Sequence, residues 1–510
     1  MGAGTSVTDV SSQLSAASDE DLKTALAALP AESKAKLMAA LVVSPSQTFV
    51  ASIQASLDAI AAKDTDLNSC VEVLSESALK MAAEADARPP ESHRPLEGQP
   101  ILVKANIDLA GTLTTNAMPG MTTFRPATTA GVVSKLMEAG AIPIAKTTLP
   151  EAAFGLWGWS KVHGLTKNPH NPQYTAGGSS VGTAVGIAAG YAAMGLGSDT
   201  EGSMRGPAAL NGICGFRPSL LRYPTSGIVP CNIAHDTAGP MATTMAGVAT
   251  LDAVIMGEDP ASYTPANLAS LTVAVAGDWD DALHAAQLAS VEQTISALEA
   301  AGATVKRGAA LKPVQAGVEG FDEISYRLEG FRAYCESHQN LGKTAEEILE
   351  ESFYPSIKTF FLEPKGLKGP MVNITDFEGE ERAALEKKHE EGMVAWEAMY
   401  EALFAEHSAD VLLVPSLTGT PAPVQEDYSA FGPTIMAHMK AYSAYMALNG
   451  LKVPSLVLPN PRTKIEDFEG GALPTGVLLY GKAGADKPLI EVGMALEKAL
   501  QAKQDETRGV

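Results

Sequence analysis

One stretch of the chain, residues 177–219, constrains the fold more than any other. It opens with a Gly-Gly-Ser-Ser motif at 177–180 and continues through an Ala/Gly/Val segment long enough for one helix. A second motif rich in glycine and serine follows at 197–205. Glycines beside serines favour turns in which backbone N–H groups face a cavity instead of a sheet neighbour. One such motif alone would indicate an ordinary Gly/Ser loop, but two in succession predict serine-bearing turns on either side of a packed helix.

The two motifs resemble those of the amidase signature family, whose members carry Gly-Gly-Ser-Ser-Gly-Gly followed by a G-[ST]-D-x-G-G-S-[IV]-R-x-P run. The resemblance implies a Ser-cisSer-Lys triad, with Ser203 as the nucleophile and Ser179, after a cis peptide bond, as the bridging serine. It also implies a lysine that closes an upstream apolar strand, and Lys104 occupies that place. The resemblance covers residues 60–500, with one divergent insert.

The resemblance also implies backbone donors and supporting residues around the nucleophile. The oxyanion hole would consist of the N–H groups of Thr200, Glu201, Gly202 and Ser203. The supporting residues would be Gly178, Ser180, Asp199 and Arg205. Of these, Asp199 and Arg205 are better suited to pairing or capping around the turn than to reaction.

A lysine can activate a serine only as a neutral amine, so its reference pKa of about 10.4 has to fall by several units. Burial lowers the pKa of an amine, and Lys104 follows the apolar residues 101–103. The expected chemistry is an acyl-enzyme path in which Ser203 attacks an amide carbonyl, Ser179 relays the proton, and Lys104 is the base. Water then releases the acid, and the resemblance implies neither a metal nor an organic cofactor.

Four positions depart from the family pattern. Val181 and Glu201 replace glycines, Ala105 replaces an aspartate, and Ser198 replaces a threonine. Glu201 matters most, because a Cβ restricts the backbone and an inward carboxylate would repel the developing oxyanion. We expect the Glu201 side chain to point away from the cavity and activity to survive.

Short strands that alternate with helices predict an α/β fold. A strand at residues 100–105, a helix at 129–139 and a strand at 141–146 form a parallel crossover unit. Together with the resemblance, this predicts a large twisted mixed β-sheet with helices on both faces over residues 91–505. Later segments fit the pattern, including a strand at 271–276 and a helix at 282–301.

Two regions flank or interrupt this predicted core. Residues 1–90 predict a mobile N-terminus and a helical layer packed on the core, with helices at 19–41, 46–62 and 76–87. Residues 312–399 are the divergent insert, which the resemblance assigns to the substrate pocket. Its many aromatic residues form either an apolar lid or ordinary helix packing, and helical spacing favours packing.

Composition excludes several classes of partner. The chain of 510 residues has a formal net charge of −22, so the phosphates of a nucleic acid would be repelled. It contains no uninterrupted apolar run of the roughly twenty residues that a membrane helix needs, and no secretory leader, which favours a cytoplasmic protein. The start of the chain fits the loose pattern for N-myristoylation at Gly2, but a flexible Gly/Ser start explains it better.

The string His-Asp-Thr-Ala-Gly-Pro-Met-Ala at residues 235–242 resembles the mandelamide and indoleacetamide hydrolase subgroup. This resemblance implies cleavage of a small-molecule amide, by preference an aryl acetamide, to an acid and ammonia or an amine. Esters, carbamates and fatty amides remain open as substrates, with ester cleavage as a side activity. Two alternatives stay open as well: an amidase subunit of a transamidosome, and a catalytically degraded binding protein of the same fold. A zinc hydrolase is disfavoured because the nine histidines form no HxxxH pair. A homodimer is common in the family, but the residues do not reveal the oligomeric state.

Overall fold

The computed structural model describes residues 48–278, 283–317, 323–362, 371–419, 421–424, 448, 450–466 and 469–508. The helices expected at residues 19–41, and Gly2, lie outside the described residues.

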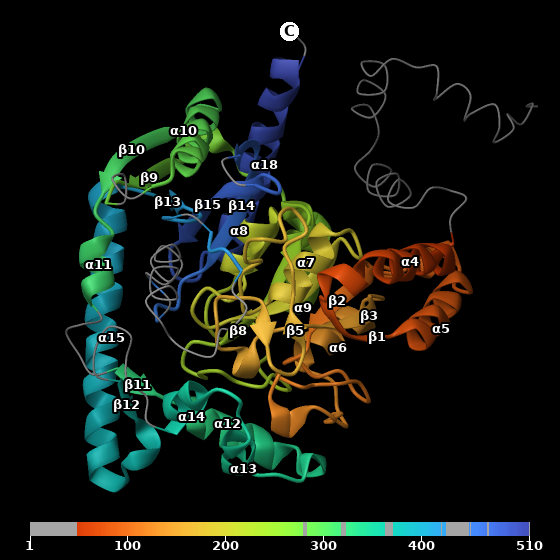
Figure 1. The fold of residues 1–510 in the computed structure, drawn as a ribbon. Helices are drawn as coiled ribbons and strands as arrows, with labels where there is room; N and C mark the ends of the chain where they lie inside the picture. Colours follow the sequence, from red (N-terminus) through yellow and green to blue (C-terminus); the bar gives the residue numbers. More distant parts are fainter. Residues whose placement is uncertain are drawn as a thin grey trace, which may run out of the picture.

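The centre of the molecule is a mixed sheet of eleven strands (Figure 1). In spatial order the strands are β1 (Cys70–Val73), β3 (Ile142–Thr147), β2 (Pro100–Lys104), β6 (Met194–Asp199), β8 (Thr237–Ala242), β7 (Cys214–Arg217), β14 (Ser455–Ile465), β15 (Leu473–Gly481), β13 (Val411–Pro415), β9 (Thr272–Ala276) and β10 (Thr304–Ala309). The strands β3, β2 and β6 run parallel, as do β13, β9 and β10, whereas the other neighbouring pairs are antiparallel. The predicted crossover unit is therefore present as a parallel β2–β3 pair joined through α6 (Gly131–Glu138).

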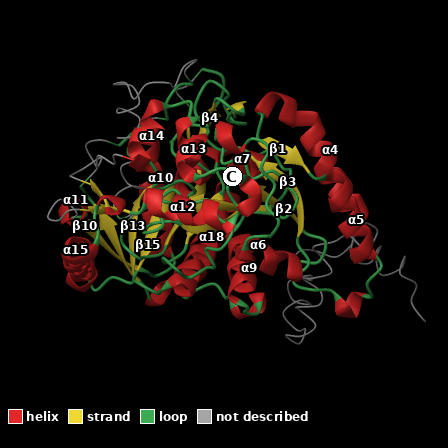
Figure 2. Cartoon of the chain, turned by 90° about the horizontal axis from the view of Figure 1, so that it is seen from below, coloured by secondary structure: helices red, strands yellow, loops and turns green. Residues whose placement is uncertain are grey.

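Alternate residues of each strand enter two separate cores, because successive side chains of a strand point to opposite faces. On β2, Ile101 and Val103 belong to the core covered by α6, α9 (Met245–Met256), α10 (Ala285–Ala300) and α18 (Asp486–Arg508). Leu102 belongs to the opposite core, covered by α4 (Phe49–Leu67), α5 (Ser75–Asp86), α7 (Val181–Ala188) and α8 (Arg205–Asn211). Figure 2 shows the strand layer between α7 on one side and α6 and α9 on the other. The predicted α/β sheet with helices on both faces is confirmed.

The N-terminal helices α4 and α5 pack against the β1 end of the sheet (Figure 1). Their buried residues, among them Ile53, Leu57 and Ala82, join the same core as Leu102 and Ile144. Apolar residues at helical spacing place one stripe of each helix against the sheet. These helices form the described part of the expected helical layer.

The segment between the two serine turns contains one more element than its pattern indicated. Between the two serine turns lie both the helix α7 and the strand β6, so the expectation of a single helix was wrong. Gly190, with a φ of 83°, follows the end of α7 and turns the chain toward the sheet. The strand escaped detection because its sequence, MGLGSD, overlaps the second glycine and serine turn and contains only two large apolar residues.

Part of the insert forms a small helical body beside the sheet, whereas its first and last helices pack into one core of the sheet (Figure 1). Its elements are α11 (Lys312–Ala316), β11 (Glu323–Ser325), α12 (Arg327–Ser337), α13 (Ala345–Glu350), α14 (Pro355–Leu362), β12 (Met371–Asn373) and α15 (Gly379–His407). Phe331, Tyr354 and Phe361 are buried in a separate core, which also takes in Met118 and Phe124 from the loop after β2. Most insert aromatics therefore serve helix packing.

Two further short strands, β4 (Trp159–Ser160) and β5 (Gly164–Leu165), pair in the loop that precedes the first serine turn. Among the helices that the structure describes, none combines the length and apolar character needed to cross a lipid bilayer.

The close packing of α7 on the sheet makes Gly182 sensitive to substitution. A Cβ on Gly182 would lie 2.4 Å from the Ser69 carbonyl oxygen and from the Thr148 backbone nitrogen, and neither can rotate away. We expect Gly182→Ala to cost up to about 3 kcal/mol, and to lower the Tm by several degrees in thermal unfolding followed by circular dichroism. Gly190→Ala is the matched control, because its Cβ would enter open space. Only the positive φ would then lower the free energy of unfolding, by about 1 kcal/mol. Equal losses in the two variants would contradict this account.

Candidate active site

Lys104 lies at the carboxyl end of β2, with its amine between two serine hydroxyls. Its Nζ is 2.7 Å from Ser179 Oγ and 2.8 Å from Ser198 Oγ. The side chain is fully buried, and this burial lowers the pKa of Lys104 to about 7 because the charged form loses its hydration. Lys104 is therefore a buried amine that can lose its proton near neutral pH.

The first serine turn is fixed by sterics and by backbone contacts. The peptide bond between Gly178 and Ser179 is cis, as the resemblance implies. A Cβ on Gly178 would lie 2.4 Å from the Gly155 carbonyl oxygen, so only glycine fits there. Ser179 is fully buried, and its hydroxyl accepts from Lys104.

Ser180 joins the two serine turns. Its backbone N–H donates to the Ser203 carbonyl oxygen at 2.8 Å. Its hydroxyl donates to the Ser198 carbonyl oxygen at 3.0 Å and accepts from the Ser198 backbone N–H at 3.1 Å. Residues from positions far apart in the stretch 177–219 are thus held side by side, with Ser203 nearly buried next to them.

Asp199, the last residue of β6, organises the turn at residues 200–203, called the nucleophile turn here after the role predicted for Ser203. Its carboxylate accepts from the backbone N–H groups of Gly202 and Met204 and is paired with Arg205 Nε at 3.0 Å and Arg217 Nη1 at 3.1 Å. Burial alone would raise the pKa of Asp199, but the two guanidinium groups and the hydrogen bonds outweigh it and hold the pKa well below its usual range. Asp199 and Arg205 have the pairing and capping geometry expected of supporting residues.

The nucleophile turn itself, residues 200–203, is anchored through its side chains. The Thr200 hydroxyl donates to Asp236 Oδ1, and Glu201 Oε1 accepts from Arg327 Nη2 at 3.1 Å. The Gly202 N–H donates to Asp199 at 2.8 Å, and a backbone N–H has only one hydrogen to give. Gly202 therefore drops out of the expected oxyanion donors, which leaves the N–H groups of Thr200, Glu201 and Ser203 as candidates.

A family model described as Amidase matches residues 51–490, most of the chain. The chain belongs to the amidase signature family. It is an amidase, a hydrolase that acts on carbon–nitrogen amide bonds.

Known relatives of this amidase resemble it along most of its length. It is 29% identical over 467 residues to the mandelamide hydrolase of Pseudomonas putida, an alignment that covers 87% of each chain. It is 29% identical to the indoleacetamide hydrolase of Rhizobium radiobacter over 79% of this chain and 84% of that one. The solved structure of the native peptide amidase from Stenotrophomonas maltophilia aligns with a TM-score of 0.70 and 25% identity, over 91% of this chain and 96% of that one.

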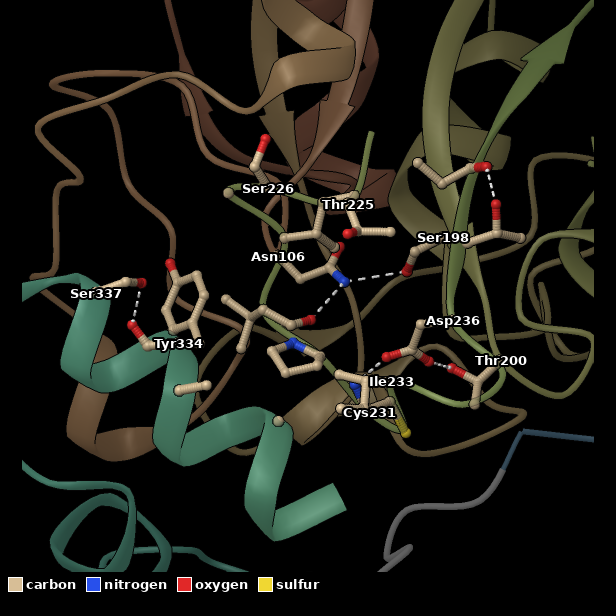
Figure 3. Close-up of a pocket in the computed structure, with 18 of the residues that line it drawn as sticks. Asn106, Ser198, Thr200, Thr225, Ser226, Cys231, Ile233, Asp236, Tyr334 and Ser337 are labelled. Atoms are coloured by element: carbon tan, nitrogen blue, oxygen red, sulfur yellow. Dashed lines mark hydrogen bonds between the residues drawn. The ribbon is translucent and has the colours of Figure 1, made fainter. Parts of the chain in front are cut away.

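A cleft of about 460 Å³ lies beside the amidase site (Figure 3), although its lining does not include Lys104, Ser179 or Ser203. Its lining includes Asn106, Ser198 and Thr200, and one wall is formed by α12 through Gly330 and Tyr334. Asn106 Nδ2 donates to Ser198 Oγ at 3.0 Å, so the cleft touches the hydrogen-bond network that holds Lys104. The remaining lining, from residues 225–238, is mainly apolar.

Several residues that support the amidase site were absent from the sequence-based set. Arg217 lies in the stretch 177–219 and Asp236 in the run 235–242, and a charged residue within a run of apolar and small residues is the signal that could have identified them. Arg327 lies in the divergent insert, where no motif points to the nucleophile turn. Within the described residues, no group of three or more His, Cys, Asp or Glu side chains is arranged to hold a metal ion.

The buried amine of Lys104 makes a prediction about stability. An unfolded lysine has a pKa of about 10.4, whereas burial lowers that of Lys104 to about 7. Between these pH values the unfolded chain binds a proton that the folded chain does not, so this residue opposes folding increasingly as the pH falls toward 7. We expect Lys104→Met to raise the Tm most at pH 7, and the gain to shrink as the pH approaches 10.

Thermal unfolding of wild type and variant from pH 7 to pH 10 measures this difference. Lys80→Met on α5 is the control, because the Lys80 side chain is exposed to water. A Tm difference for Lys104→Met that stays constant with pH would contradict a buried neutral amine.

Proposed function

We propose that this amidase hydrolyses the primary amide of a small aryl-substituted acetic acid through an acyl-enzyme on Ser203. The observation that carries the proposal is the buried contact between Lys104 Nζ and Ser179 Oγ, 2.7 Å apart, next to the turn that bears Ser203. A serine hydroxyl is a weak nucleophile without a neighbouring base. The neutral amine of Lys104 supplies that base, and Ser179 connects it to Ser203.

The acylation step moves one proton inward as one bond forms. Ser203 Oγ attacks the amide carbon, its proton passes to Ser179 Oγ, and the proton of Ser179 passes to Lys104 Nζ. The carbonyl oxygen becomes an oxyanion that the N–H groups of Thr200, Glu201 and Ser203 stabilise. The carbon–nitrogen bond then breaks, and the proton returns along the same relay to the departing nitrogen, which leaves as ammonia.

Deacylation repeats the relay with water as the nucleophile. Water attacks the acyl carbon, its proton moves through the relay to Lys104, and Ser203 recovers a proton as the acid leaves. The relay starts and ends with a neutral lysine, so no net charge accumulates in the buried site. A relay without net charge is favourable here because a net charge on a group that has lost its hydration would be costly.

The choice of an aryl acetamide rests on the relatives and on the cleft. Mandelamide hydrolase and indoleacetamide hydrolase are named for amides whose acid carries an aromatic ring. The cleft beside Thr200 is mainly apolar and large enough for a ring. Burying such a ring stabilises the complex by about 1.5–3 kcal/mol, which corresponds to about 10- to 100-fold in kcat/KM.

A fluorophosphonate probe tests the nucleophile directly. We expect a single covalent adduct on Ser203, located by mass spectrometry of the digested protein, and no adduct in Ser203→Ala. The purified chain alone should release ammonia from phenylacetamide and indoleacetamide faster than from acetamide. An adduct on another residue would refute the assignment of Ser203. Absence of turnover with every free amide would favour a transamidosome subunit or a binding protein.

The pH dependence of kcat/KM tests the base. Lys104 accepts a proton only when neutral, so activity should fall tenfold per pH unit below about pH 7 and level off above it. Burial also raises the pKa of Asp236 to about 6, so a second group titrates nearby. Temperature separates them, because proton release from an amine absorbs much heat and release from a carboxyl absorbs little. Warming should therefore shift the acidic limb to lower pH, and a limb that stays in place would assign it to a carboxyl group.

A further inference from the structure

Arg327, the first residue of α12, brings a buried positive charge from the insert to the nucleophile turn. Its side chain is 1% exposed. Its Nη2 donates to Glu201 Oε1 at 3.1 Å, and its Nη1 donates to the Cys231 carbonyl oxygen at 3.1 Å. The guanidinium also lies over the Phe360 ring, 3.8 Å from its centroid. One side chain thus connects the insert, the turn that carries Ser203 and the loop after β7.

The charge balance identifies Glu201 as the partner that Arg327 needs. A buried guanidinium is costly unless a charge of opposite sign and hydrogen-bond acceptors compensate it. Burial raises the pKa of Cys231 to about 11, so this thiol, 3.0 Å from Nη1, is neutral at neutral pH. The carboxylate in direct contact with Arg327 is that of Glu201, which is three-quarters buried.

The contact also determines where the Glu201 carboxylate lies. Thr200 and Glu201 are consecutive, and both side chains are anchored to the same segment, residues 231–236. Thr200 reaches Asp236 directly, and Glu201 reaches Cys231 through Arg327. With both side chains held at this segment, the backbone between them is fixed at the place where the proposed oxyanion donors are needed.

We propose that Arg327 is a positioning residue, which holds the Glu201 carboxylate outside the oxyanion hole and thereby permits an acidic residue where the family pattern has glycine. This inference rests on the proposed function, because it requires residues 200–203 to surround the reacting carbonyl. Without Arg327, the carboxylate would be partly buried, unpaired and free to turn toward the developing oxyanion. Like charges in that position raise the energy of the transition state.

The same helix links this contact to the cleft. Gly330, Tyr334 and Ser337 follow Arg327 at helical spacing on α12, and all three line the cleft. Arg327 therefore couples the wall of the cleft to the nucleophile turn. A substrate that contacts this wall is held by the same helix that keeps Glu201 in place.

Arg327→Met is the primary test, because methionine retains an apolar side chain against Phe360 and removes every donor. We expect kcat for phenylacetamide to fall about 10- to 100-fold, the range below the loss of one complete oxyanion donor, with a smaller change in KM. The rate of fluorophosphonate labelling at Ser203 should fall in parallel, since phosphonylation also develops charge on an oxygen at the same site. Arg327→Lys should be intermediate.

The double variant Glu201→Gly with Arg327→Met provides the decisive comparison. It removes the carboxylate together with its partner, so we expect kcat to recover most of what Arg327→Met loses. A merely structural role for Arg327 predicts no recovery. Arg332→Met is the matched control, because Arg332 lies on the same helix in an exposed pair with Glu346, and its loss should leave kcat unchanged.

Wild-type kcat in Arg327→Met, or equal losses in the single and double variants, would overturn the proposal. If Arg327→Met does not fold, as judged by circular dichroism, the double variant and Arg327→Lys are compared instead, and a lower kcat in the double variant would overturn it. Ser203→Ala separates this inference from the proposed function. Full activity in that variant refutes the nucleophile, whereas an inactive Ser203→Ala beside a fully active Arg327→Met refutes only the positioning role.

Discussion

The site depends on the burial of one amine, that of Lys104, away from water. Lys104 is enclosed by the sheet, and its Nζ contacts the hydroxyls of Ser179 and Ser198. Hydroxyls accept a hydrogen bond from a charged or a neutral amine but add no negative charge, so burial decides the protonation state. A carboxylate in either serine position would keep the lysine charged. The fold therefore lowers the pKa of this amine, as its proposed role of base requires, by excluding both water and direct counter-ions.

The topology explains how this exclusion is achieved. Lys104 and Asp199 are the last residues of β2 and β6, which are parallel neighbours, so both side chains emerge at the same edge of the sheet. Ser179 and Ser180 approach that edge from the start of α7. Active sites at the carboxyl ends of parallel strands are general in α/β proteins, because the chain leaves the sheet there in loops. Asp199 also bears two arginines, which prevents its own charge from acting on the lysine at full strength.

Much of the fold and part of the site could be predicted from the residues. The spacing of strands and helices predicted the parallel β2–β3 unit, and the motif predicted that Lys104 and Ser179 would meet, as their 2.7 Å contact bears out. The strand β6 was missed because its six residues include two glycines, a serine and an aspartate, which are typical of a turn. The engagement of the Gly202 N–H by Asp199 was missed because hydrogen-bond partners within a turn depend on dihedral angles that residue types do not specify. Arg327 could not be found, since its partner Glu201 is 126 positions away and lies outside the insert.

The ion pair between Glu201 and Arg327 has an evolutionary consequence. The parts proposed for chemistry lie on the sheet, whereas Arg327 belongs to a peripheral segment whose sequence diverges from the family. Such a segment would ordinarily be free to drift, or to be exchanged for another with a different shape. The proposed positioning role links the two residues: a lineage that loses Arg327 would then be expected to lose Glu201 as well, so the two positions should vary together among related genes. The acidic residue Glu201 would in this way limit how far the sequence of the insert can diverge at position 327.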